Sequence, residues 1–166
     1  MSQSIYSGIV FQSQSVVHFG RMLVPFLRPV SAPRKIALST LQLVAIIDDD
    51  ESVRVTTDSL VRSLGCIVET FPSAEEFLRS DRIDDFACVI ADVQMPGMSG
   101  VQLQQHLRAA GSRVPFIFLT AFPDERVRAQ ALAAGATCYL SKPCDPGSLV
   151  QCFEAALNAD RGRAGN

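Results

Sequence analysis

The chain has 166 residues, 48% of them hydrophobic, and a formal net charge of −2, so it can bury the core of one domain that carries a tail. Residues 1–47 hold four bases and no acid, whereas residues 48–166 hold 11 bases and all 17 acids. An acidic domain argues against direct nucleic-acid binding. No stretch reaches the roughly 18 apolar residues that a membrane span needs.

Residues 1–40 are predicted to be a disordered basic extension, because Gln and Ser are frequent there and three prolines interrupt the apolar residues. A secretory signal is excluded by the lack of any base before Arg21, while a peripheral membrane anchor stays an alternative. We expect one domain over residues 41–160, a frayed tail over 161–166, no output domain and a cytoplasmic location.

From residue 41 onward, short apolar runs alternate with segments whose apolar residues have helical spacing. Strands are predicted at residues 41–47, 67–71, 87–91, 115–119 and 137–140. Helices are predicted to start near Ser52, Ser73, Ser99, Pro123 and just before Leu149. Five strands that alternate with five helices through short connections predict an α/β fold with a parallel sheet and helices on both faces.

Polar residues follow four of these strands. Asp48 and Asp49 end the first strand, Asp92 the third, Thr120 the fourth and Lys142 the fifth. Open α/β sheets bind ligands at the carboxyl ends of their strands, so these side chains converge if their strands are neighbours. Two carboxylates about 4 Å apart repel by about 4 kcal/mol at an effective dielectric of 20. A hard cation such as Mg²⁺ would relieve that repulsion.

These residue types suit phosphoryl transfer, which needs a nucleophile and neutralisation of charge on the moving group. Asp92 supplies a carboxylate nucleophile, Lys142 a positive charge and Thr120 a hydroxyl hydrogen bond. Each has a simple structural alternative: Asp92 as a turn or cap residue, Lys142-Pro143 as a turn, and Thr120 as a strand end. The acids Asp50 and Glu51 are explained by the start of a helix alone.

Four motifs resemble those of two-component response regulator receiver domains, the CheY-like superfamily, and are most similar to receivers of the nitrogen-fixation regulator type. They are Ile46-Ile47-Asp48-Asp49-Asp50, Asp92-Val93-Gln94-Met95-Pro96-Gly97-Met98-Ser99-Gly100, Thr120-Ala121 and Lys142-Pro143. The resemblance covers about residues 41–160. It implies a flavodoxin-like, doubly wound five-stranded sheet with strand order 2-1-3-4-5.

The resemblance also implies roles for the site residues. Asp92 would be the phosphoacceptor, and Mg²⁺ would be bound by Asp49, Asp92 and the backbone carbonyl of Gln94, with Asp48 helping through water. The phosphoryl donor would be a sensor histidine kinase or a histidine phosphotransfer protein. The chain would then be no enzyme beyond its own phosphorylation and dephosphorylation.

A switch is implied as well. Thr120 and Lys142 would contact the phosphoryl group, and Tyr139 would be the aromatic residue that changes position. The face that responds would be the fourth helix, the fifth strand and the last helix. That face is a candidate for homodimer formation.

Two other functions stay open. Asp48-x-Asp50 mimics the D-x-D motif of haloacid-dehalogenase-like Mg²⁺-dependent phosphatases, although that family's further acidic motif and cap are missing. A pseudo-receiver that binds partners without phosphate would lack Asp92, Asp49 or Lys142, and this chain has all three.

The cysteines are odd in number and none has C-x-x-C spacing: Cys66, Cys88, Cys138, Cys144 and Cys152. We expect these cysteines to be reduced and to act as small hydrophobic side chains, with neither a disulfide nor a zinc site. His106 has no partner at ligand spacing, so a structural or exposed position is expected.

Overall fold

The structure, a computed structural model, describes residues 42–161. The extension predicted for residues 1–40, and all of the predicted tail except its first residue, lie outside the described residues. Among the described helices, none has the length and apolar composition that a membrane span requires.

The five strands and five helices alternate as the sequence predicts, with bounds shifted by a few residues. The strands are β1 (Leu43–Ile47), β2 (Ile67–Phe71), β3 (Cys88–Asp92), β4 (Phe116–Thr120) and β5 (Ala136–Ser141). The helices are α1 (Glu51–Ser63), α2 (Ala74–Leu78), α3 (Gly100–Ala109), α4 (Glu125–Ala133) and α5 (Pro146–Arg161). A short 3₁₀ helix, η1 (Ile83–Asp85), was not predicted.

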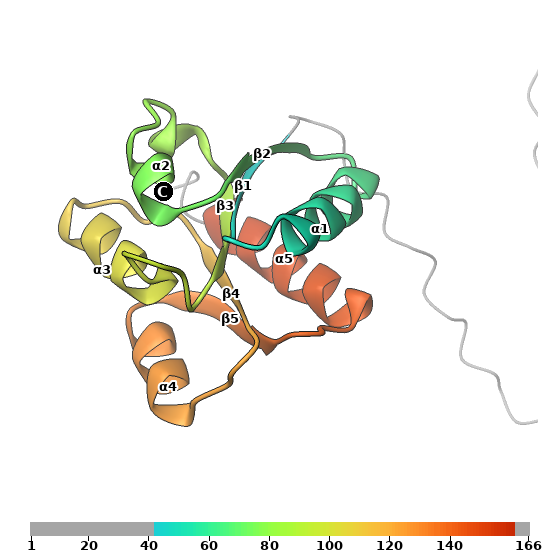
Figure 1. The fold of residues 1–166 in the computed structure, drawn as a ribbon. Helices are drawn as coiled ribbons and strands as arrows, with labels where there is room; N and C mark the ends of the chain where they lie inside the picture. Colours follow the sequence, from blue (N-terminus) through green and yellow to red (C-terminus); the bar gives the residue numbers. More distant parts are fainter. Residues whose placement is uncertain (1–41, 162–166) are drawn as a thin grey trace, which may run out of the picture. The chain divides into compact units, whose positions relative to one another are not determined.

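The strands form one parallel sheet in the order β2-β1-β3-β4-β5, which confirms the predicted topology. Helices α1 and α5 cover one face and α2, α3 and α4 cover the other (Figure 1). The chain goes from β1 to β2 on one side of the sheet and then from β3 through β4 to β5 on the other. The outer strands of the sheet are therefore β2 and β5.

Both faces of the central strands are buried, which is why their sequences are apolar without alternation. In β1, Leu43, Ala45 and Ile47 pack with α2, α3 and α4, while Val44 and Ile46 pack with α1 and α5. Successive side chains of a strand point to opposite faces, so one apolar run supplies both halves of the core.

Side-chain caps fix where the helices begin. The Asp50 carboxylate accepts hydrogen bonds from the backbone N–H groups of Ser52 and Val53 at the start of α1. Ser99 and Gln102 form a reciprocal capping box at the start of α3. For α4, the cap is Asp124, which explains why this helix begins at Glu125, two residues after the predicted start.

The prediction of reduced cysteines is wrong for Cys138 and Cys152, which are joined by a disulfide in the structure. The bond connects β5 to α5, which pack on each other at the edge of the sheet. A separation of 14 residues gave no local signal for this pairing, because only packing brings the strand and the helix together. Cys88 is buried, as expected, and His106 is exposed.

Gly100, the first residue of α3, lies against the end of β3. A Cβ atom at this position would overlap the backbone carbonyl oxygen of Asp92 and lie 3.2 Å from the Phe118 ring. The helix can approach the strand this closely only because residue 100 has no side chain. The position of Asp92 is thereby coupled to the packing of α3.

Replacing Gly100 tests this close approach. Gly to Ala inside a helix ordinarily stabilises by up to about 1 kcal/mol, but Gly100→Ala should destabilise by about 1–3 kcal/mol because the strand backbone must shift. The measurement is the free energy of unfolding in urea. Gly147→Ala is the matched control, because its added Cβ meets only the movable Asp145 carboxylate and should change stability little. Equal stability of the two variants would contradict the packing argument.

Candidate functional site

The polar residues that end or follow β1, β3, β4 and β5 lie together at the carboxyl ends of the strands, because these four parallel strands are neighbours in the sheet. Asp48 and Asp92 are buried, with exposed fractions of 2% and 8%. Thr120 is also buried, whereas Asp49 is exposed. The arrangement is thus a partly buried acidic cluster, called the acidic pocket below, whose solvent-exposed member is Asp49.

Lys142 bridges the two buried carboxylates. Its ammonium nitrogen Nζ donates to Asp48 Oδ2 at 2.5 Å and to Asp92 Oδ2 at 2.8 Å. The Lys142 side chain is itself only 15% exposed. Buried charges need partners of opposite sign, so these contacts explain how two acids are tolerated here side by side.

Burial and pairing shift the ionisation of this trio. Burial raises the pKa of Asp48 above its usual value, although hydrogen bonds from Lys142 and the Asp50 amide act in the opposite direction. Burial acts to lower the pKa of Lys142, but the hydrogen bonds and charges of Asp48 and Asp92 outweigh it and raise that pKa. Lys142 is therefore held in its ammonium form.

Three carboxylates could hold a cation together. Asp48, Asp49 and Asp92 each offer an oxygen, and these oxygens lie within 4.8 Å of one another. Backbone amides hold two of the groups in place: Asp50 N–H donates to Asp48 Oδ1 and Gln94 N–H to Asp92 Oδ1. An all-oxygen donor set of this kind fits Mg²⁺, which binds one or two carboxylates and keeps several waters.

Thr120 and Tyr139 are close to the pocket but their hydroxyl groups are engaged elsewhere. Thr120 Oγ1 accepts from the backbone N–H of Phe122 at 3.2 Å and lies 3.3 Å from the Phe122 carbonyl. The Tyr139 hydroxyl accepts from the Asp124 N–H at 3.5 Å, and its ring centroid lies 6.5 Å from that of Phe118. In this conformation neither hydroxyl contacts Asp92.

Two supporting contacts were not found from the sequence. Arg54, on α1, donates from Nη1 to the backbone carbonyl of Asp48 at 2.6 Å. Glu75, on α2, accepts from the backbone N–H of Met98 at 2.8 Å. Arg54 follows its partner by six residues at the start of a predicted helix, which is a weak signal. Glu75 and Met98 are 23 residues apart, so no local pattern could reveal their contact.

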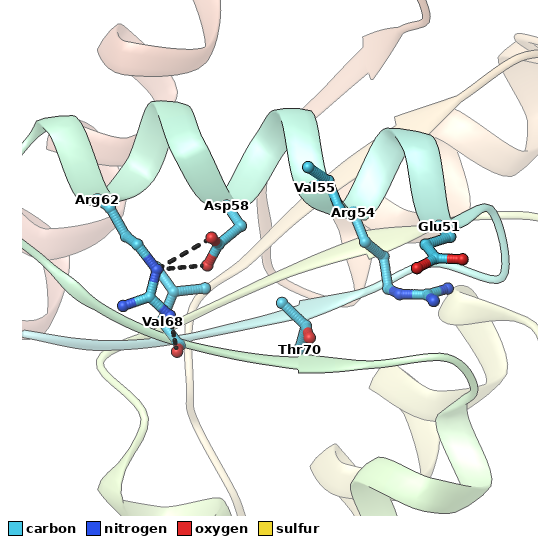
Figure 2. Close-up of a pocket in the computed structure, with 7 residues that line it drawn as sticks. All are labelled: Glu51, Arg54, Val55, Asp58, Arg62, Val68 and Thr70. Atoms are coloured by element: carbon cyan, nitrogen blue, oxygen red, sulfur yellow. Dashed lines mark hydrogen bonds and ion pairs between the residues drawn. The ribbon is translucent and has the colours of Figure 1, made fainter.

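A separate groove runs between α1 and the edge strand β2 (Figure 2). It contains none of the three carboxylates. Arg62 spans it, bonded to Asp58 and donating to the Val68 carbonyl at 2.7 Å. That contact covers part of an edge strand that could otherwise pair with another chain. Arg54 lies at the end of the groove beside Glu51, so the groove's arginines contact the protein's own groups.

The sequence profile of the response regulator receiver domain matches residues 44–154, which is most of the described domain. The chain belongs to this family. Receiver domains act in two-component signalling and bind Mg²⁺ in an acidic pocket, and the receiver domain described here has a matching acidic cluster.

Individual relatives agree with the family. The transcriptional regulatory protein TdiR of Thauera aromatica is 41% identical over 118 residues, which are 71% of this chain and 52% of TdiR. The transcriptional regulatory protein FixJ of Azorhizobium caulinodans is 35% identical over 122 residues, 72% of this chain and 58% of FixJ. The receiver chain spans about half the length of the curated relatives it matches.

Solved structures show the same fold. A structure of the response regulator StyR superposes with a TM-score of 0.70 at 38% identity, covering 75% of this chain and 63% of StyR. A crystal structure of FixJ-N gives a TM-score of 0.65 at 29% identity, covering 72% of this chain and 95% of FixJ-N. The sheet topology and the superpositions on solved structures therefore both show the doubly wound fold predicted from the sequence.

Proposed function

We propose that this receiver domain accepts a phosphoryl group on Asp92 from a sensor histidine kinase or a histidine phosphotransfer protein. The observation that carries the proposal is the contact of Lys142 with both Asp48 and Asp92. This contact places an ammonium group beside the proposed carboxylate nucleophile at the carboxyl ends of the parallel strands, where ligands of such folds bind. The role is signal transfer, without turnover of an external substrate.

In the proposed step, the phosphorus–nitrogen bond of a phosphohistidine breaks and a phosphorus–oxygen bond to the Asp92 carboxylate forms. The electron pair of the broken bond stays with the imidazole nitrogen. Lys142 holds its positive charge beside the attacking carboxylate and offsets charge on the phosphoryl oxygens. The Gln94 amide orients the carboxylate through Asp92 Oδ1.

Asp49, Asp92 and the Gln94 backbone carbonyl are the proposed Mg²⁺ ligands, with Asp48 acting through water. Bound Mg²⁺ would neutralise the carboxylates and the negative charge of the transferring group. The exposure of Asp49 supports this assignment, because the cation and its retained waters need an open side of the pocket.

Asp92→Asn tests the acceptor. The substitution removes the charge and one carboxylate oxygen but keeps the side-chain size and one acceptor oxygen, so labelling by acetyl phosphate and Mg²⁺ should fall below detection while the circular dichroism spectrum is retained. Intact-protein mass spectrometry measures the label as one phosphate per chain.

Asp58→Asn is the matched control, because Asp58 lies on α1 outside the pocket, and it should label normally. Labelling of Asp92→Asn would remove Asp92 as acceptor. Failure of the unaltered protein to label would favour a pseudo-receiver, and steady hydrolysis of varied phosphoesters would favour a phosphatase.

Mg²⁺ should stabilise the domain, because it relieves repulsion among the three carboxylates. Saturating the site at 100 times Kd would add about 2.7 kcal/mol of unfolding free energy, seen as a higher Tm. Asp49→Ala should be neutral or slightly stabilising without metal and should lose most of the Mg²⁺ response. Asp81→Ala is the control: it removes the same charge from an exposed turn and should keep the full Mg²⁺ response. An unchanged response in Asp49→Ala would place the cation elsewhere.

Phosphorylation is proposed to switch the face formed by α4, β5 and α5. A phosphoryl group offers new acceptors to Thr120, whose hydroxyl bonds to the Phe122 backbone in this conformation. Tyr139 would fill space vacated by that movement, since the hydrogen bond that its hydroxyl accepts from the Asp124 N–H is long, at 3.5 Å. The altered face is the proposed surface for a homodimer or another partner.

Hydrogen exchange measures the switch. With beryllofluoride as phosphoryl mimic, the change in exchange should be largest over residues 120–145, because the β4–α4 connection and β5 rearrange. The Asp92→Asn variant with the same mimic is the control and should show no such change. A response concentrated in α1 and α2 would contradict the proposed output face.

A further inference from the structure

An acidic side chain of α2 accepts a hydrogen bond from the connection that runs from Asp92 to α3. Glu75 Oε1 accepts from the Met98 N–H at 2.8 Å, across 23 residues of sequence. This connection, residues 93–99, includes Gln94, whose amide bonds to Asp92 and whose carbonyl is a proposed metal ligand.

The backbone at Gly97 leaves space for the Glu75 carboxylate beside the Met98 amide. Gly97 has a φ of +76°, a left-handed conformation that favours glycine. A Cβ atom on Gly97 would lie 2.6 Å from Glu75 Oε1, closer than atoms can approach without displacement. Gly97 therefore supplies both the turn and the room through which Glu75 reaches the Met98 amide.

The Val93 and Met95 side chains of the connection are buried in the core, and its other hydrogen bonds within the described domain lie at its two ends. Val93 N–H donates to the Leu119 carbonyl, and Gly100 N–H donates back to Val93. Ser99 belongs to the capping box of α3. Between these ends the Pro96-Gly97-Met98 turn projects toward α2, where Glu75 meets it. Hydrogen bonds from the backbone of Glu75 itself and then from the Met98 amide lower the pKa of Glu75, so this acceptor is ionised at neutral pH.

We propose that Glu75 is a positioning residue for the acidic pocket: by holding the Met98 amide it fixes the 93–99 connection and hence the Gln94 backbone beside Asp92. The inference rests on the proposed function for its link to Mg²⁺. Glu75 acts through the Met98 amide and the Gln94 backbone, and is assigned no contact with metal or phosphate.

The experiment compares Glu75→Ala and Glu75→Gln with Glu76→Ala. Glu76 is the next residue of α2, exposed and equally charged, so its variant matches the loss of one negative charge from the helix's first turn. Glu75→Gln removes the charge but keeps a side-chain oxygen that can accept the Met98 hydrogen bond.

The first readout is backbone hydrogen exchange in protein without metal. Glu75→Ala should speed exchange of the Met98 amide about tenfold, as expected for loss of a hydrogen bond to a charged group. Glu75→Gln should give a smaller change, and Glu76→Ala should match the unaltered protein. Unchanged exchange in Glu75→Ala would overturn the proposal. So would faster exchange throughout α2, because Glu75 would then only stabilise its own helix.

The second readout is the Mg²⁺ concentration at half-maximal thermal stabilisation. It should rise several-fold in Glu75→Ala, recover in Glu75→Gln and stay unchanged in Glu76→Ala. Equal shifts in both Glu75 variants would overturn the proposal, since charge and not positioning would be responsible. If the unaltered protein fails to label with acetyl phosphate, the proposed function fails, whereas the exchange result still decides whether Glu75 holds the connection.

Discussion

The contact of Lys142 with Asp48 and Asp92 is the interaction on which the site depends. Two carboxylates buried at adjacent strand ends would otherwise oppose folding, because each loses hydration and repels the other. One ammonium group that reaches both relieves these costs. It also draws the end of β5 toward β1 and β3, so that the chemistry of the pocket and the position of the edge strand are connected.

That connection has consequences for the rest of the domain. β5 carries Tyr139 and Cys138, and the disulfide to Cys152 joins the same strand to α5. β5 is thus held at its carboxyl end by the ion pairs of Lys142 and within the strand by the disulfide to α5. Any event that changes the partners of Lys142 acts on a strand already coupled to the proposed output face.

The acidic pocket is also supported by helices from both faces of the sheet. Gly100 brings α3 against the Asp92 carbonyl, and Glu75 holds the connection between them. Arg54 binds the Asp48 carbonyl from α1. Carboxylates that must stay close despite their repulsion are therefore attached to backbone segments fixed by three different helices. Such support keeps the geometry of a charged site when its occupant changes.

The sequence alone was sufficient for the class of fold, the order of its elements and the edge at which Asp48, Asp92 and Lys142 gather. The elements follow from local rules, because apolar runs form buried strands. The gathering of the polar residues follows from the carboxyl ends of parallel strands lying together, provided that the strands are neighbours, and that order came from the resemblance to receiver domains. Tertiary structure alone decided that Cys138 meets Cys152, that Glu75 reaches Met98 and that Thr120 bonds to its neighbouring backbone in this conformation. Such contacts depend on the distances between packed helices and strands, which sequence spacing does not encode. The local pattern of the chain thus predicts where the polar groups emerge, and packing determines which of them touch.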